Sequence, residues 1–291
     1  MGHYNHRVHA GNAGDVWKHF LLLEAADCLL DPEGSLVYAE SHVGRPEYAL
    51  RAPGDWEGGI GKIWPLLPSL NNFCYFDILA DLNPENLSFF PCYEPISKQV
   101  SGPFSRSISG PFSGPLLYPG SACLIYELAK RKGANLQADV WDNDPGVASS
   151  WESFTQAAAA KSTGSFQPAK IVFHQGDGFL GVLSHLRRSP PGLLFIDPPY
   201  IDPEDVRLAR KLLQRARERG WIVLWWYMTD MKTAPDGLRT FELQFAEAGL
   251  EGGRWKGAVV AFASAESERF DHLISHMHRQ IEKFIRILKL E

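Results

Sequence analysis

The sequence lacks the short motifs that identify several large enzyme classes. Its 291 residues contain no Gly-Lys-Ser/Thr phosphate-binding loop, no Gly-x-Ser-x-Gly nucleophile elbow and no clustered Cys or His spacing of the kind that holds a metal ion. Phosphate-loop, hydrolase and metalloenzyme chemistry therefore have no support in the sequence. We expect no metal site.

Cysteine is scarce, and long apolar runs are absent. The spacing of the cysteines favours reduced thiols over disulfides or metal ligands at Cys28, Cys74, Cys92 and Cys123. No run reaches the ~20 apolar residues of a membrane span, and residues 1–12 are too polar for a secretory signal. We expect a cytoplasmic protein without a membrane partner.

A net positive charge is also missing. The formal net charge of -5 at pH 7 argues against a surface coated for nonspecific binding to nucleic acid. Any contact with RNA is therefore expected on one face of the molecule. A chain of this length, with 45% hydrophobic residues, is near the upper size of one hydrophobic core. We expect one large α/β domain, and a monomer.

Strand-like apolar runs alternate with helical segments along the chain, which predicts a doubly wound, mostly parallel α/β sheet. The expected helices cover residues 13–30, 58–67, 122–132, 178–186, 203–219 and 266–290, and the expected strands 36–39, 138–142, 170–173, 193–196, 221–227 and 259–262. We interpret residues 1–291 as a single domain with an N-terminal tail, 1–12. An inserted subdomain, 49–117, includes a part rich in Gly, Pro and Ser that we expect to be flexible.

The stretch Asp197-Pro198-Pro199-Tyr200 follows one of these strands and carries the strongest chemical signal. Both prolines fix φ and lack an N–H, so the carbonyl groups of the turn remain available as acceptors. The exocyclic amine of adenine fits such a turn, with one hydrogen donated to the Asp197 carboxylate and one to the Pro198 carbonyl, while Tyr200 offers a flat face to the base. Asp and Pro also favour turns for local reasons, so a plain strand-ending turn is the alternative.

Acidic residues at the ends of other strands indicate a nucleotide site at the same edge of the sheet. Asp142 is placed to bind ribose hydroxyls, and Asp177 to accept the amine of a cofactor adenine, with Gly178 at the start of the next helix. An acid that is simply exposed at a strand end is the alternative. Residues 40–46, which include His42, resemble the first corner of a nucleotide-binding sheet.

Helix starts and the N-terminal tail supply the remaining candidates. The apolar stripe of the first helix leaves Lys18 and His19 at a border where a cleft could use them. Ser121 opens a later helix, where a serine either caps the helix or binds a carboxylate, and capping is the commoner role. The tail contains Tyr4 and His6. It suits contact with RNA better than a metal ion, because no carboxylate or Cys accompanies its histidines.

Together these segments resemble the ribosomal RNA large subunit methyltransferase J family. The resemblance runs from the N-terminus to the last strand and rests on Tyr4, His9-Ala10-Gly11-Asn12, Asp15-Val16, Lys18-His19, His42, Gly58 to Trp64, Tyr118-Pro119-Gly120-Ser121, Asp177-Gly178-Phe179 and Asp197-Pro198-Pro199-Tyr200. The tail signature combined with the Asp-Pro-Pro-Tyr turn is specific. The resemblance implies that the chain is a class I, Rossmann-like enzyme that uses S-adenosylmethionine to methylate N6 of one adenine in 23S ribosomal RNA.

By position, the resemblance implies a role for each candidate. The cofactor and target site would be lined by His19, His42, Ser121, Asp142, Asp177, Gly178 and Asp197, with Lys18 beside them, and Tyr4 and His6 would contact the RNA. Methyl transfer would occur at Asp197, Pro198 and Tyr200. The chain departs from the family pattern at Asp142, where the family has Glu, and at Glu40-Ser41-His42-Val43-Gly44-Arg45-Pro46, which replaces a turn of the Asp-Thr-His-Ala-Gly-x-Gly type.

Three alternatives stay open. A DNA adenine-N6 methyltransferase would share the turn, although we find no separate sequence-reading domain. A glutamine-amide methyltransferase would typically carry Asn in place of Asp197. A non-catalytic RNA-binding relative with an altered cofactor corner is the third, because Pro46 stands where a second glycine would help the backbone approach a ligand.

Overall fold

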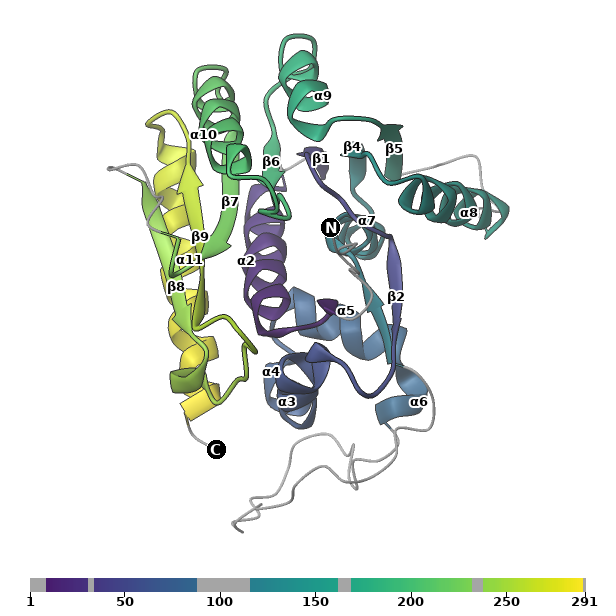
Figure 1. The fold of residues 1–291 in the computed structure, drawn as a ribbon, viewed down its shortest axis with the longest axis vertical. Coiled ribbons are helices and arrows are strands. Elements are labelled where there is room, and N and C mark those ends of the chain that lie inside the picture. Colours follow the sequence, from purple (N-terminus) through teal and green to yellow (C-terminus); the bar gives the residue numbers. More distant parts are fainter. Residues whose placement is uncertain (1–8, 31–33, 88–115, 162–168, 232–237, 290–291) are drawn as a thin grey trace.

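A computed structural model describes residues 9–30, 34–87, 116–161, 169–231 and 238–289. Its main feature is a seven-stranded sheet in the order β5-β4-β1-β6-β7-β9-β8 (Figure 1). The strands are β1 (Ser35–Glu40), β4 (Asn135–Asp142), β5 (Ala169–Gln175), β6 (Leu193–Ile196), β7 (Ile222–Met228), β8 (Arg239–Gln244) and β9 (Gly257–Ala263). The five adjacent strands β5, β4, β1, β6 and β7 pair in parallel, whereas β9 runs antiparallel to both of its neighbours, β7 and β8. The doubly wound, mostly parallel sheet expected from the sequence is confirmed.

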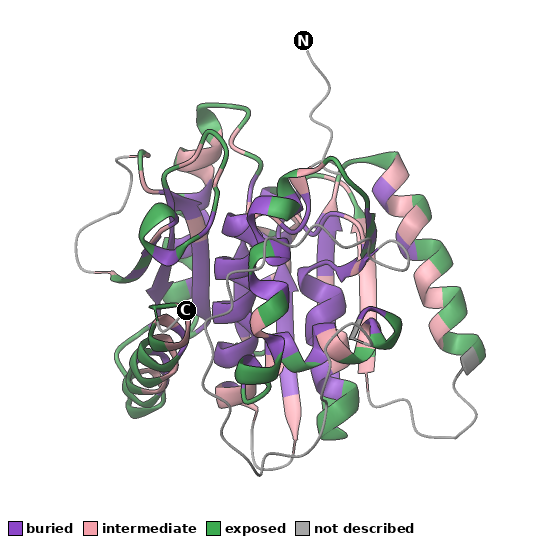
Figure 2. Ribbon diagram, turned by 90° about the horizontal axis from the view of Figure 1, so that it is seen from below, coloured by how far each residue is buried: buried purple, intermediate pink, exposed green. Residues whose placement is uncertain are grey.

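Helices cover both faces of this sheet (Figures 1 and 2). One face carries α2 (Ala13–Leu29), α7 (Ser121–Lys132), α8 (Pro145–Lys161) and α11 (Glu268–Lys289), and the other carries α9 (Gly178–His185) and α10 (Glu204–Arg217). Strand β6 shows why both faces are apolar. Leu193 and Phe195 join the core under α2, while Leu194 and Ile196 join the core under α9 and α10. A strand buried on both faces reads as a continuous apolar run.

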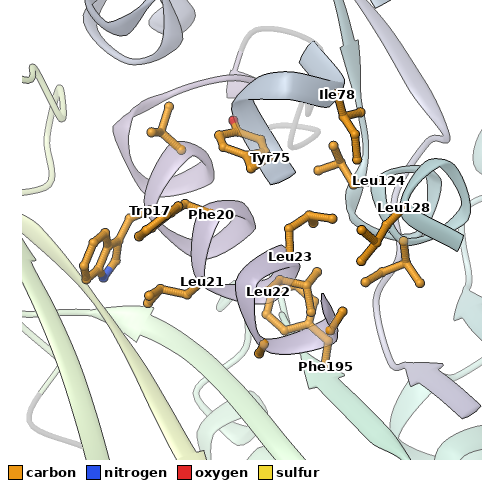
Figure 3. Packing of buried hydrophobic residues seen from close by; sticks show 14 of the residues in the cluster. Trp17, Phe20, Leu21, Leu22, Leu23, Tyr75, Ile78, Leu124, Leu128 and Phe195 are labelled. Atoms are coloured by element: carbon orange, nitrogen blue, oxygen red, sulfur yellow. The ribbon is translucent and has the colours of Figure 1, made fainter. Parts of the chain in front are cut away.

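Helix α2 lies at the centre of the larger core. It packs against α5 (Cys74–Leu82), α7, α11 and the sheet, and Figure 3 shows its side chains surrounded by those of neighbouring elements. Because it is covered on all sides, Lys18 and His19 are buried along with its apolar residues. We expected these two side chains at the border of a one-sided apolar stripe. That expectation is wrong, because neighbouring elements cover the polar side of the helix as well as its apolar side.

The segment expected to be an insertion, 49–117, begins and ends in a two-stranded antiparallel sheet, in which β2 (Glu47–Leu50) pairs with β3 (Leu116–Pro119). The described part between these strands holds η1 (Asp55–Gly58), α3 (Ile60–Ile63), η2 (Trp64–Leu66), α4 (Leu67–Leu70), α5 and α6 (Pro84–Leu87). The single helix expected over 58–67 is wrong. Pro65 and Pro68 each remove an N–H donor and restrict the preceding residue, so the chain forms short helical turns instead.

A last 3-10 turn, η3 (Ala246–Ala248), connects β8 to β9. Cys28, Cys74 and Cys123 are free thiols, and Cys92 lies outside the described residues. Across the described ranges, no helix is both long and apolar enough to span a membrane.

Candidate active site at the carboxyl edge of the sheet

The order of the strands reverses between β1 and β6, which lie side by side. In open α/β sheets, ligands bind outside the carboxyl ends of the strands at such a switch point. The turn that begins at Asp197 follows β6, and the corner that contains His42 follows β1. A hydrogen bond from the Ser41 N–H to the Phe195 carbonyl, 3.2 Å long, joins the two strand ends. The two stretches that the sequence singles out therefore meet at one edge.

Lys18 links helix α2 to the Asp-Pro-Pro-Tyr turn. Its Nζ lies 2.7 Å from Oδ2 of Asp197 and 2.8 Å from Oδ1 of Asp15, and all three side chains are at least 87% buried. Burial alone lowers the pKa of Lys18, but the carboxylates of Asp15 and Asp197 outweigh it and hold that pKa above its usual value. The ammonium also lies 4.8 Å from the ring centroid of Trp226. Asp197 therefore sits in a charge network with a fixed geometry.

Tyr200 is fixed by strand β7. Its hydroxyl donates to the Trp226 carbonyl and accepts a hydrogen bond of 2.7 Å from the Trp225 indole N–H. Its backbone has φ of +53°, a left-handed conformation that is uncommon for a tyrosine. Burial raises the pKa of the phenol, which keeps it protonated. The hydrogen bonds of the hydroxyl to β7 therefore fix the orientation of the Tyr200 ring. The sequence had indicated only that the ring offers a flat face to a base.

Glu40 ends β1 in complete burial. Its Oε1 accepts a 2.5 Å hydrogen bond from the Ser121 hydroxyl, and its Oε2 accepts one of 2.7 Å from the Tyr38 hydroxyl. Burial raises its pKa to about 8, against the opposing effect of these two hydrogen bonds. Of the two roles left open for Ser121, a helix cap or contact with a carboxylate, the structure shows contact with a carboxylate. Gly120 occupies the N-cap position, and the hydroxyl of Ser121 is directed to the end of β1 instead.

The start of α9 packs directly on the first corner. A Cβ atom at Gly178 would lie 1.5 Å from the Ser41 carbonyl oxygen, so only glycine fits there. Phe179 contacts the ring of His42 edge-on, with ring centroids 4.6 Å apart. Burial lowers the pKa of His42 to about 4, although the Asp177 carboxylate opposes this shift. The corner residue is therefore a neutral imidazole at neutral pH.

The two acids proposed for the cofactor both bind backbone N–H groups. The carboxylate of Asp142 accepts from Gly44, at 3.1 Å, and from Asp144, at 2.9 Å. Asp177 is the N-cap of α9 and accepts from Leu180 at 3.0 Å. Asp142 thus ties the end of β4 to the first corner.

His19 belongs to a separate buried chain of hydrogen bonds. Its Nδ1 lies 2.9 Å from the hydroxyl of Tyr118, which lies 2.9 Å from the hydroxyl of Tyr75. Tyr4 and His6 lie outside the described residues. The described end of the proposed tail, residues 9–12, packs on the insertion, because the Ile60 N–H donates to the Gly11 carbonyl at 2.9 Å.

Sequence reasoning missed three residues of this site. Asp15, Glu40 and Trp226 contact predicted site residues, but we assigned them no role. The i, i+3 spacing of Asp15 and Lys18 on a helix was an available signal, since such residues are neighbours on its surface. Within the described parts of the chain, no group of three or more His, Cys, Asp or Glu side chains could hold a metal ion.

Comparisons with known proteins bear on the fold and on one stretch of the sequence. No protein-family model matches the sequence. A stretch of 66 residues, 21% of the chain, is 35% identical to ribosomal RNA large subunit methyltransferase J from Haemophilus influenzae and spans 24% of that relative's length. The crystal structure of protein LPL1258 from Legionella pneumophila, described as family-model DUF519, covers 95% of this chain and 94% of its own, with a TM-score of 0.65 and 19% identity.

Two further structures align over about half of the chain. One is a putative methyltransferase, yhhF, from Escherichia coli; it is 16% identical and covers 48% of this chain and 69% of its own, with a TM-score of 0.30. The other is an O-methyltransferase family protein from Burkholderia thailandensis; it is 14% identical and covers 50% of this chain and 48% of its own, with a TM-score of 0.30. The sheet order, with its one reversed strand, gives the chain the Rossmann-like fold of methyltransferases, and the partial sequence match supports methyl transfer.

Proposed function

We propose that this protein methylates N6 of an adenine in 23S ribosomal RNA, with S-adenosylmethionine as the methyl donor. The observation that carries the proposal is the Asp-Pro-Pro-Tyr turn at the switch point of the sheet, where Lys18 holds Asp197 and β7 holds Tyr200. The partial sequence match to a ribosomal RNA methyltransferase supports the choice of substrate.

The residues at the strand ends suit the cofactor chemically. Acceptors for ribose hydroxyls and for an adenine amine are supplied by Asp142 and Asp177, at successive strand ends. The tight contact of Gly178 with Ser41 keeps side-chain bulk out of the space between these loops. His42 and Ser121 border the same corner. When bound, S-adenosylmethionine supplies a methyl group activated by its sulfonium.

Asp197 and Pro198 would then orient the target amine. The Asp197 carboxylate and the Pro198 carbonyl each accept one N6 hydrogen, and this pulls the nitrogen lone pair out of conjugation with the ring and toward the methyl group. Tyr200 supports the base by stacking once the adenine has left its helix. Its ring is suited to this because its hydroxyl is already bound to β7, which limits rotation of the side chain.

Asp197 does not need to act as a strong base. The N6 proton becomes acidic only after the methyl group has been transferred, so a carboxylate paired with Lys18 is sufficient to take it up. The ion pair keeps this carboxylate in one orientation, which places the acceptor before the substrate arrives. Positioning therefore contributes more to this mechanism than proton abstraction.

The acceptor is tested by offering one cofactor to three substrates. Purified protein is incubated with labelled S-adenosylmethionine and either protein-free 23S RNA that lacks the modification, duplex DNA of the same sequence, or a glutamine-containing peptide. We expect label in the RNA alone, and none with Asp197→Asn. Label in duplex DNA would favour a DNA methyltransferase. Failure of the folded protein to bind the cofactor at all would favour a non-catalytic RNA-binding protein.

A further inference from the structure

Trp226 of strand β7 is connected to both ends of the Asp-Pro-Pro-Tyr turn. Its main-chain carbonyl accepts the hydroxyl of Tyr200, and the centroids of the two rings lie 5.9 Å apart. The face of its indole contacts the ammonium of Lys18, with Nζ 4.8 Å from the ring centroid. The same ammonium lies 2.7 Å from Oδ2 of Asp197. One residue outside the turn is therefore linked to its first and its last residue.

Alternation along β7 directs the indole toward helix α2. Trp225 belongs to the core under α10, so the next side chain, Trp226, lies on the opposite face of the sheet and packs on the core around α2. A Cβ atom at Gly14 would lie 3.3 Å from Cζ2 of this indole, which shows how closely helix and ring approach. Lys18 follows Gly14 by four residues and shares its side of the helix. The ring therefore lies where it meets the end of the Lys18 side chain.

The indole supplies the third contact of the Lys18 ammonium. An ammonium has three N–H donors, and two of them are taken by the carboxylates of Asp15, at 2.8 Å, and Asp197, at 2.7 Å. The side chain is 6% exposed, so little solvent reaches the third donor. Among the described residues, the remaining partner is the face of Trp226, which lies within the ~6 Å at which an aromatic face attracts a cation.

Trp226 acts through the face of its ring and not through its N–H group. Its Nε1 is buried and has no hydrogen-bond partner among the described residues. Phenylalanine at this position would therefore keep the part of the side chain that meets Lys18. Leucine would remove it, because an aliphatic side chain has no aromatic face to offer a cation.

The third contact matters because two carboxylates share one ammonium. Asp15 lies three residues before Lys18 on the same helix, and residues at this spacing are neighbours on the helix surface. Asp197 belongs to a separate element, so its contact requires the ammonium to point away from α2 toward the turn. Without the indole face, the ammonium could shift toward Asp15 and leave the turn.

We propose that Trp226 is a positioning residue for methyl transfer, whose indole face holds the Lys18 ammonium against Asp197 and so fixes the acceptor carboxylate relative to Tyr200. This proposal rests on the proposed function, because the fixed carboxylate is given a part in orienting the target amine. Trp226 acts on Asp197 through Lys18. Its loss should therefore slow the transfer step and leave cofactor binding unchanged.

The contact is measured first, in the free protein. In protein labelled with 15N-lysine, a buried ammonium exchanges its protons slowly enough to be observed by NMR, and an adjacent aromatic face shifts them upfield. Lys18→Arg identifies the signal, because it keeps the charge and removes the ammonium. We expect an upfield signal in the wild type, a smaller upfield shift in Trp226→Phe and none in Trp226→Leu.

The wild-type spectrum tests the contact even if Trp226→Leu fails to fold. A Lys18 ammonium that exchanges rapidly with solvent, or that resonates with the exposed lysines, would overturn the proposal. An upfield signal that stays unchanged in folded Trp226→Leu would also overturn it, because the shift would then arise from another group.

Transfer is measured next, as the rate of a single turnover with saturating S-adenosylmethionine and protein-free 23S RNA, beside the Kd of S-adenosylhomocysteine. We expect Trp226→Leu to lower the rate about tenfold and Trp226→Phe to lower it less than about threefold, with the Kd unchanged in both. Equal rates in the two variants would show that the aromatic face is not needed. That result, or a rise in Kd as large as the loss of rate, would overturn the proposal.

Trp255→Leu is the matched control. A cation also lies over the ring of Trp255, with Cζ of Arg254 4.3 Å from the centroid, but this residue is on the loop between η3 and β9, outside the strands that hold the turn. The variant should keep the wild-type Lys18 signal and the wild-type rate. If the wild type transfers no methyl group to RNA, the proposed function is refuted. The NMR measurement then still decides whether Trp226 holds the Lys18 ammonium.

Discussion

The buried ion network around Lys18 gives the most demanding prediction for stability. Lys18→Met keeps the length and packing of the side chain but removes the charge that neutralises Asp15 and Asp197. Their side chains are 9% and 13% exposed, so two carboxylates would be left close together with little solvent. Removal of one partner from a buried ion pair costs about 3–5 kcal/mol, mainly because the other charge remains unpaired.

For a chain of this size, that loss corresponds to a decrease in Tm of roughly 10 °C, at about 2–4 °C for each kcal/mol. The assay is urea unfolding, followed by the fluorescence of the 9 tryptophans, together with a thermal scan. Asp15→Asn combined with Lys18→Met should recover part of the loss, because it removes one of the two uncompensated charges.

Lys62→Met is the control for loss of a lysine charge. Lys62 pairs with Glu251 at 2.8 Å, but these side chains are 47% and 69% exposed, and such surface pairs contribute about 0–1 kcal/mol. If Lys18→Met loses no more stability than Lys62→Met, then Lys18 does not neutralise the two acids and the account of the site is wrong.

Three further predictions concern the first corner. Gly178→Ala should destabilise the fold by about 3 kcal/mol in urea unfolding, because its Cβ would lie 1.5 Å from the Ser41 carbonyl oxygen and the backbone must move; a loss under 1 kcal/mol would show that the contact relaxes freely. Because burial raises the pKa of Glu40 to about 8, the folded state holds an extra proton relative to the unfolded state, and wild-type stability should fall as pH rises from about 4.5 to 8. Glu40→Gln should therefore gain about 2 kcal/mol relative to the wild type between pH 5.5 and 7.5, and identical pH profiles would contradict this. Asp142→Asn should weaken binding of S-adenosylhomocysteine about tenfold, since the amide removes one acceptor and turns a donor toward the Gly44 N–H or the ribose.

Much of the fold could be predicted because the strands are strongly apolar. A strand buried on both faces, such as β6 with Leu193 to Ile196, has a continuous apolar run that only a central position explains. Edge and inserted strands do not have this signal. Strand β8 was missed because only alternate residues of Arg239 to Gln244 are buried, and β2 pairs with β3 across more than 60 residues of chain. Local sequence carries little information on such distant pairing.

The candidate site could be predicted in position but not in its internal contacts. Acids and turns at the ends of parallel strands converge because of topology, so Asp142, Asp177 and Asp197 could be grouped from sequence. Which hydrogen bond each side chain makes depends on distances of a few tenths of an ångström between separate elements. The Ser121 hydroxyl binds Glu40 across 81 residues of chain, and nothing near Ser121 in the sequence indicates this partner.

The most direct test of the central claim is the identity of the methylated nucleoside. RNA from a reaction with isotopically labelled S-adenosylmethionine is digested to nucleosides, and each is analysed by mass spectrometry. The account predicts label in N6-methyladenosine with the wild type and none with Asp197→Asn, provided the variant is folded. Label in any other nucleoside, or undiminished N6-methyladenosine with Asp197→Asn, would contradict it.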